Sequence, residues 1–160
     1  MREGDNLHMP DTIIIDLDNT LYEYSPCHSK AHEDLVSFLS LKVGMQRREI
    51  RDALEHAREQ VKKRLGDVAA SHNRLIYIEQ MMLEKKLGYR PEVLLQAQQT
   101  YWSSFLRIME LRPGAEDFLL LCRQNATEIV ILTDLTSEIQ HRKMIKLGIE
   151  SFIDKLYSSE

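Results

Sequence analysis

Residues 12–21 have the sequence TIIIDLDNTL, in which a β-branched apolar run leads into two aspartates. The run lacks polar alternation, a pattern typical of a strand buried on both faces in a parallel α/β sheet. Asp16 and Asp18 are two residues apart, and in an extended chain this spacing places both side chains on the same side. Ligands of open α/β sheets bind beyond the carboxyl ends of the strands, so the two carboxylates should converge at a ligand site. A hard divalent cation such as Mg²⁺ is the natural partner for such a pair.

A second apolar run, residues 128–134 with the sequence EIVILTD, also ends in polar side chains. The Thr133 hydroxyl can donate to a phosphate oxygen, and we group it with Asp134 as the candidate phosphate-binding residues. For Asp134, capping of the helix that follows is a further role, which we favour over metal binding. Together these groups suggest phosphoryl chemistry, in which Asp16 attacks phosphorus, Asp18 moves the proton and Mg²⁺ neutralises charge.

The chain between and after these two runs is predominantly helical in pattern. Ser25 followed by Pro26 predicts the start of a helix that stops at Gly44. Further helices are expected at residues 47–65, 71–87, from Pro91 onward, 115–122 and 137–147, with a third strand at 155–159. This order predicts a βαβ architecture that is interrupted after its first strand by about four helices.

Composition excludes several classes of protein. The 160 residues carry 21 Lys and Arg against 25 Asp and Glu, a net charge of −4, which argues against general nucleic-acid binding. No apolar run is long enough to span a bilayer, so we expect no membrane partner. Cys27 and Cys122 do not suggest a disulfide framework, and the polar residues 1–10 lack the apolar segment of a signal peptide. We therefore expect a cytoplasmic protein with a flexible N-terminus at residues 1–10.

Residues 13–21 resemble the first motif of the haloacid dehalogenase superfamily, an apolar strand followed by Asp-x-Asp-x-Thr. Residues 129–134 resemble its second motif, and Gln140-x-x-Lys143 resembles part of the segment that usually follows. The helical insert resembles the helical cap of the phosphatase branch. This resemblance implies a Rossmannoid α/β parallel-sheet core, incomplete at the C-terminus, from residues 11–24 and 111–160, with a helical cap at 25–110.

The resemblance also implies a role for each motif residue. Asp16 matches the nucleophile that forms an aspartyl-phosphate, and Asp18 matches the general acid/base, which also gives a backbone carbonyl to Mg²⁺. Thr133 matches the phosphate-binding hydroxyl, while Asn19 and Thr20 complete the first motif. True dehalogenases lack the second aspartate, so the resemblance implies phosphoryl transfer rather than carbon–halogen cleavage.

The implied activity is that of a Mg²⁺-dependent phosphatase acting on a small phosphorylated metabolite, over which the cap closes. Candidate substrate contacts are Tyr22, Tyr24, His72, Arg74 and Tyr77, of which we select Tyr22, His72 and Arg74. A phosphomutase that uses the same nucleophile stays open as an alternative, as does a non-catalytic binding or interaction module derived from this family.

The sequence departs from the family at its C-terminal end. The family's third motif, a lysine that pairs with nucleophile and phosphate, and its acidic fourth motif lie beyond the position of Glu160. We assign no lysine of this chain to the third motif, because none of the available ones matches its position: Lys143, Lys146 and Lys155. We therefore expect the 160-residue chain to have little or no phosphatase activity. We also expect an exposed apolar edge at residues 13–17, to be covered by a partner or a second copy.

Cys27, His28 and His32 raise the alternative of a zinc site in the first predicted helix. A fourth ligand and a paired Cys-x-x-Cys spacing are missing, so we favour a pair of histidines on the helix surface.

Overall fold

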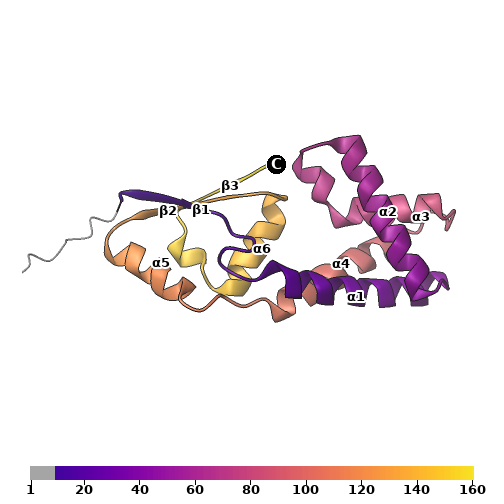
Figure 1. The fold of residues 1–160 in the computed structure, drawn as a ribbon, viewed down its shortest axis with the longest axis horizontal. Helices are drawn as coiled ribbons and strands as arrows, with labels where there is room; N and C mark the ends of the chain where they lie inside the picture. The colour runs from indigo at the N-terminus through magenta and orange to yellow at the C-terminus, as the bar shows by residue number, and fades with distance from the viewer. Residues whose placement is uncertain (1–9) are drawn as a thin grey trace, which may run out of the picture.

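A computed structural model of the protein describes residues 10–160, and within them three parallel strands form one sheet. The strands are β1 (Thr12–Ile15), β2 (Glu128–Thr133) and β3 (Lys155–Ser158), with β2 in the middle (Figure 1). Ile15 pairs with Ile131, and Thr133 pairs with Ser158, so the carboxyl ends of all three strands point to the same end of the sheet. The flexible terminus predicted for residues 1–10 falls on residues 1–9, outside the described part, and on Pro10.

The helices of residues 10–160 cover only one face of this sheet. Both α5 (Ala115–Gln124) and α6 (Ser137–Leu147) lie on that face, where Ile129 and Ile131 are fully buried (Figure 1). On the opposite face Ile14 is 67% exposed and Leu132 is 56% exposed. The prediction that the first strand is buried on both faces is therefore wrong, because no helix among residues 10–160 covers the second face. As expected, β1 lies at an edge of the sheet formed by the described residues.

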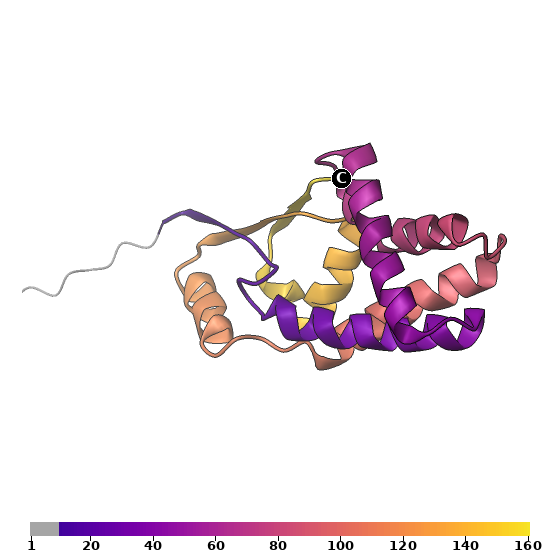
Figure 2. The ribbon, with the colours of Figure 1, turned by 45° about the vertical axis from the view of Figure 1, so that its right-hand side comes forward.

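The long insert after β1 folds as a bundle of helices. Its elements are α1 (Tyr24–Val43), α2 (Arg47–Leu65), the short 3-10 helix η1 (Ala69–His72), α3 (Arg74–Glu84) and α4 (Pro91–Ile108). Helix α1 packs along α4, and α2 packs on α3 (Figure 2). The interior of the bundle is apolar and closely packed, with fully buried side chains that include Leu39, Ile50, Ile78, Met81 and Phe105.

Most helix boundaries follow the predicted breaks. Gly44 and Gly148 end α1 and α6 with φ of 73° and 68°, a left-handed conformation that glycine adopts at little cost. The start of α1 is a correction, because the helix begins at Tyr24 and Ser25 lies inside its first turn. The Tyr24 ring stacks on His28 one turn later, with centroids 5.5 Å apart, which favours the earlier start.

The helix predicted at residues 71–87 is also a correction, because the structure divides it at Asn73. The Asn73 side-chain oxygen accepts a hydrogen bond from the Leu75 amide at 2.9 Å and caps the new helix α3. The helix then ends at Glu84, earlier than predicted, and Lys86 turns the chain with φ of 54°. An asparagine cap and a left-handed turn are local choices that apolar spacing does not reveal.

The sheet and the helical bundle are joined by two segments that run side by side. Tyr22 forms an isolated antiparallel bridge with Leu111, and the Arg112 amide donates to the Leu21 carbonyl at 2.8 Å. These contacts lie close to the boundaries predicted between the core, residues 11–24 and 111–160, and the cap, residues 25–110. The division itself stays a prediction. Among residues 10–160, no helix combines the length and apolarity that crossing a bilayer requires.

Candidate active site

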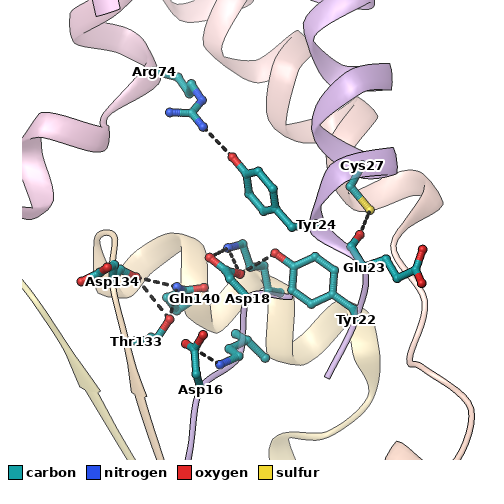
Figure 3. A network of polar contacts seen from close by, with 12 residues as sticks. Asp16, Asp18, Tyr22, Glu23, Tyr24, Cys27, Arg74, Thr133, Asp134 and Gln140 are labelled. Atoms are coloured by element: carbon teal, nitrogen blue, oxygen red, sulfur yellow. Dashed lines mark hydrogen bonds and ion pairs between the residues drawn. The ribbon is translucent and has the colours of Figure 1, made fainter. Parts of the chain in front are cut away.

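Asp16 occupies the first position after β1, with its side chain exposed at the carboxyl end of the sheet. One carboxylate oxygen accepts a hydrogen bond from the Leu17 amide at 2.7 Å, which fixes the orientation of the group (Figure 3). Among the described residues no side chain donates to Asp16, so its second oxygen is free to act on a ligand.

Asp18 differs from Asp16 because protein side chains engage both of its oxygens. The Lys143 ammonium lies 2.5 Å from one oxygen and 2.8 Å from the other. The Tyr22 hydroxyl donates to the first of these oxygens as well (Figure 3). Burial, and next the Asp18 carboxylate, raise the pKa of Tyr22, so the phenol keeps the proton that it donates.

Asn19 and Thr20 form the turn that leads the chain from the sheet towards the cap. Asn19 has φ of 62°, a left-handed conformation that asparagine tolerates better than most residues. Its side-chain oxygen accepts a hydrogen bond from Arg112 at 3.3 Å, and the Thr20 amide donates to the Leu17 carbonyl at 3.4 Å. The Arg112 contact ties the turn to the returning segment of the core, and the Thr20 contact closes the turn itself. The supporting role of both residues stays a prediction.

Thr133 ends β2 next to the segment that carries Asp16 and Asp18, and a buried glutamine donates to its hydroxyl oxygen. Gln140 in α6 donates to Thr133 Oγ1 at 2.8 Å and to the Asp134 carbonyl at 2.6 Å. The prediction that Asp134 caps α6 is wrong, since Thr136 takes the N-cap position and offers no side-chain bond. The amide and hydroxyl of Ser137 donate instead to the Glu160 carboxylate, at 2.9 and 2.7 Å.

A cavity of 260 Å³ brings the two strand ends and the cap together. Its lining residues are Asp16, Asp18, Tyr24, His72, Arg74, Thr133, Asp134 and Leu135. Of the three selected substrate candidates, His72 and Arg74 therefore face the cavity. Tyr22 does not line it, because this side chain is fully buried and its hydroxyl is bound to Asp18.

Arg74 brings a cation from the cap into this cavity without a carboxylate partner among the described residues. Its guanidinium donates to the Tyr24 hydroxyl at 2.8 Å (Figure 3). It also donates to the His72 carbonyl at 2.9 Å. The group also lies over the Tyr101 ring, 5.0 Å from its centroid, and its Nε is buried with no hydrogen-bond partner. A cation held in this way can attract an anionic ligand.

The histidines of α1 lie next to each other as predicted, with ring centroids 5.8 Å apart, but both are half-buried rather than on an open surface. His28 and His32 line a second cavity of 290 Å³ inside the cap, and Tyr24 and Arg74 line both this cavity and the first. His28 accepts from or donates to the Tyr101 hydroxyl at 2.8 Å, and burial and nearby Arg74 lower the pKa of His28 to about 4. Cys27 donates to the Glu23 carbonyl at 3.3 Å, so these three residues do not converge on a common point.

Lys143 is the site residue that sequence reasoning missed. It is fully buried, although lysine is rarely buried without a partner, and Asp18 lies 125 positions earlier in the chain. Burial lowers the pKa of Lys143, and the Asp18 carboxylate offsets this in part. The available signal was the Gln140-x-x-Lys143 spacing, which places both side chains on one face of α6, the face that carries the Thr133 contact.

Comparisons with known proteins agree with this fold. The family of haloacid dehalogenase-like hydrolases matches residues 10–160. A ribulose-1,5-bisphosphate 5-phosphatase from Halopiger xanaduensis is 31% identical over 153 residues, which cover 95% of this chain and 64% of that relative.

Solved structures show the same architecture. A 2-haloacid dehalogenase from Pseudomonas syringae aligns with a TM-score of 0.66 at 17% identity, covering 95% of this chain and 65% of that one. A haloacid dehalogenase-like hydrolase from Xanthomonas campestris aligns with a TM-score of 0.59 at 18% identity, covering 94% and 63%. The chain thus spans just under two thirds of the length of each of these relatives. Its sheet, its inserted helical bundle and the family match together show that the chain belongs to the haloacid dehalogenase-like hydrolases.

Proposed function

We propose that the protein hydrolyses phosphomonoesters of small metabolites through a phosphoryl group carried on Asp16. One observation carries this proposal: Asp16, Asp18 and Thr133 leave two adjacent strands at the same end and line a single cavity. A carboxylate nucleophile, a second carboxylate for proton transfer and a hydroxyl for the phosphate oxygens are the groups that this reaction requires.

Asp16 is the better nucleophile of the two aspartates. Its free oxygen can attack phosphorus, whereas both oxygens of Asp18 are engaged by Lys143 and Tyr22. In the first step a bond forms between the Asp16 carboxylate and phosphorus, and the bond between phosphorus and the leaving alcohol oxygen breaks. Asp18, which must enter this step carrying a proton, gives that proton to the leaving oxygen and becomes a carboxylate. In the second step water attacks phosphorus, Asp18 takes the water's proton, and inorganic phosphate leaves Asp16.

Thr133 is oriented to donate to the phosphate. Because Gln140 donates to Thr133 Oγ1 at 2.8 Å, that contact occupies a lone pair and leaves the hydroxyl proton for another acceptor. The only acceptor near it among the described residues is the Asp134 carbonyl at 3.4 Å, a long contact that a phosphate oxygen would readily replace.

Mg²⁺ fits the donor set at this end of the sheet. The Asp16 oxygen that accepts from the Leu17 amide keeps a further lone pair, and this oxygen and the main-chain carbonyl of Asp18 are hard oxygen ligands, of the type this ion prefers. No cluster of three or more His, Cys, Asp or Glu side chains suited to a metal occurs in residues 10–160, so the ion would need further ligands such as water or the substrate phosphate. When bound, Mg²⁺ would neutralise part of the charge that develops on the phosphoryl oxygens.

Arg74 supports a substrate with a second anionic group. It approaches the cavity from the cap, on the opposite side from the strand ends, and lacks a carboxylate partner within the described residues. The relative from Halopiger xanaduensis is named for a sugar bisphosphate, which has this character. We propose a phosphorylated sugar as the substrate class, with Arg74 and His72 as its contacts in the cap.

The experiment that tests this function is phosphate release by the intact natural protein from a panel of sugar phosphates, with and without Mg²⁺. Asp16→Asn should lower kcat by on the order of 10⁴-fold or more, because it removes the nucleophile. Asp117→Asn, an exposed aspartate on α5, is the matched control and should leave kcat unchanged. Full turnover by Asp16→Asn would refute the assignment of Asp16 as the nucleophile. A strict need for a bisphosphorylated activator would instead favour a phosphomutase.

A further inference from the structure

Lys143 holds the Asp18 carboxylate by both of its oxygens, from a helix that is distant in sequence. Its side chain is 0% exposed, and its ammonium lies 2.5 and 2.8 Å from the two oxygens. A buried ion pair is costly to desolvate, and an apolar residue of similar size often serves stability equally well. The pair therefore suggests a role other than stabilising the fold.

Two aromatic rings from the cap and one from the segment after β1 lie around the same ammonium. Lys143 Nζ lies 5.6 Å from the ring centroid of Phe105, 5.9 Å from that of Trp102 and 5.7 Å from that of Tyr22. Phe105 and Trp102 belong to α4, which packs along α1 in the cap, whereas Lys143 belongs to α6 beneath the sheet. A cation among aromatic faces is restrained in position as well as in charge. The location of Lys143 therefore depends on where the cap helix lies.

The two catalytic carboxylates are consequently held in different ways. Asp16 receives one hydrogen bond, from a main-chain amide, and keeps a free oxygen. Asp18 receives hydrogen bonds from Lys143 and Tyr22, both of which are fully buried. A nucleophile must be accessible, while a proton-transferring group must be held at a defined distance from the leaving oxygen.

We propose that Lys143 is a positioning residue that sets the place of the Asp18 carboxylate and transmits the position of cap helix α4 to it. This inference rests on the proposed function, because it takes Asp18 as the group that protonates the leaving alcohol. Lys143 itself touches neither the substrate nor the phosphoryl group, since it does not line the catalytic cavity. It acts through Asp18 alone.

Positioning of a general acid has a signature that a purely structural lysine lacks. An alkyl leaving group needs protonation as its bond to phosphorus breaks, whereas 4-nitrophenolate leaves without it. A misplaced Asp18 should therefore slow transfer from an alkyl phosphate far more than transfer from 4-nitrophenyl phosphate. Loss of general acid catalysis costs about 10²–10⁴-fold in rate.

The test measures first-turnover release of the leaving group from both substrates in the intact natural protein, by rapid quench. Lys143→Met should slow release from the alkyl phosphate by about 10²-fold, and release from 4-nitrophenyl phosphate by less than about tenfold. Lys146→Met, an exposed lysine on the same helix, is the matched control and should change neither rate. A first-turnover readout is used because the later hydrolysis step also needs Asp18.

Equal losses on the two substrates, or no loss on either, would overturn the proposal. If circular dichroism shows that Lys143→Met does not fold, Lys143→Gln is judged by the same ratio, since it keeps a polar donor. Failure of the proposed function is recognised separately, because the unmodified protein would then release neither leaving group.

Discussion

The sheet and the cap of this protein bury their apolar residues to very different extents. One sheet face leaves Leu132 and Tyr157 each 56% exposed, whereas in the cap Ile78 and Phe105 are fully buried. Among the described residues, the apolar side chains inside the cap are therefore enclosed on all sides, whereas the sheet is covered on one face only. The candidate site lies between them, and it depends on the covered side of the sheet, where α6 supplies Gln140 and Lys143.

The largest expected effect on stability concerns the cap interior where it meets the site. Phe105 contacts the rings of Tyr22 and Trp102, with centroids 6.1 and 5.5 Å away. Phe105→Ala should lower the free energy of unfolding by about 3–5 kcal/mol, because it leaves a cavity in a packed core. Phe118→Ala on α5, where the ring is 39% exposed, is the control and should cost less than about 1.5 kcal/mol in the same denaturant titration. Similar losses of unfolding free energy for the two variants would contradict the claim that the cap interior is more completely buried than the sheet region.

A second, smaller effect concerns the pH dependence of the cap. Burial, with nearby Arg74, lowers the pKa of His28 from 6.5 to about 4, so the folded protein binds this proton less readily than the unfolded chain. The free energy of unfolding should therefore fall as pH drops from about 6.5 to 4, by no more than about 2 kcal/mol because the ring is partly exposed.

His28→Gln should flatten this part of the pH profile, measured by urea unfolding at several pH values. His141→Gln, an exposed histidine on α6, provides the comparison and should leave the slope unchanged. An unaltered slope in His28→Gln would show that its burial does not govern acid sensitivity.

The smallest expected effect concerns the open face of the sheet. Leu132→Thr should change the free energy of unfolding of the 160-residue chain by no more than about 0.5 kcal/mol, since its side chain buries little surface. Threonine is β-branched, a side-chain type that strands favour. A loss above about 2 kcal/mol in thermal or denaturant unfolding would show that this face is covered in solution.

Much of the fold could be predicted because its boundaries are chemically marked. Gly44, Gly148 and Pro91 delimit helices by backbone geometry alone, and α2 and α6 have the predicted bounds. The exposure of one face of the first strand was not predictable from its apolar run, because burial depends on which elements cover the sheet. The break at Asn73 was hidden, since a local side-chain cap competed with a continuous apolar pattern.

The candidate site likewise has residues that the sequence predicts and contacts that it does not. Asp16, Asp18 and Thr133 come together because parallel strands end at one edge, a rule that a sequence pattern can use. The bond between Lys143 and Asp18 joins residues 125 positions apart and depends on how α6 packs beneath the sheet. At the start of α6, Glu160 accepts from the Ser137 amide in the place predicted for Asp134, and this too is a tertiary contact. Such pairings arise from packing, which local spacing does not determine.

The most direct test of the central claim, phosphoryl transfer to Asp16, is chemical trapping of the intermediate. The intact natural protein would be mixed with a phosphomonoester and Mg²⁺, quenched within one turnover and treated with borohydride, which reduces an aspartyl-phosphate to homoserine. Peptide mass spectrometry should find homoserine at position 16 and nowhere else, and Asp16→Asn should show none. Turnover without any modification at Asp16, or homoserine at Asp18 instead, would contradict the account.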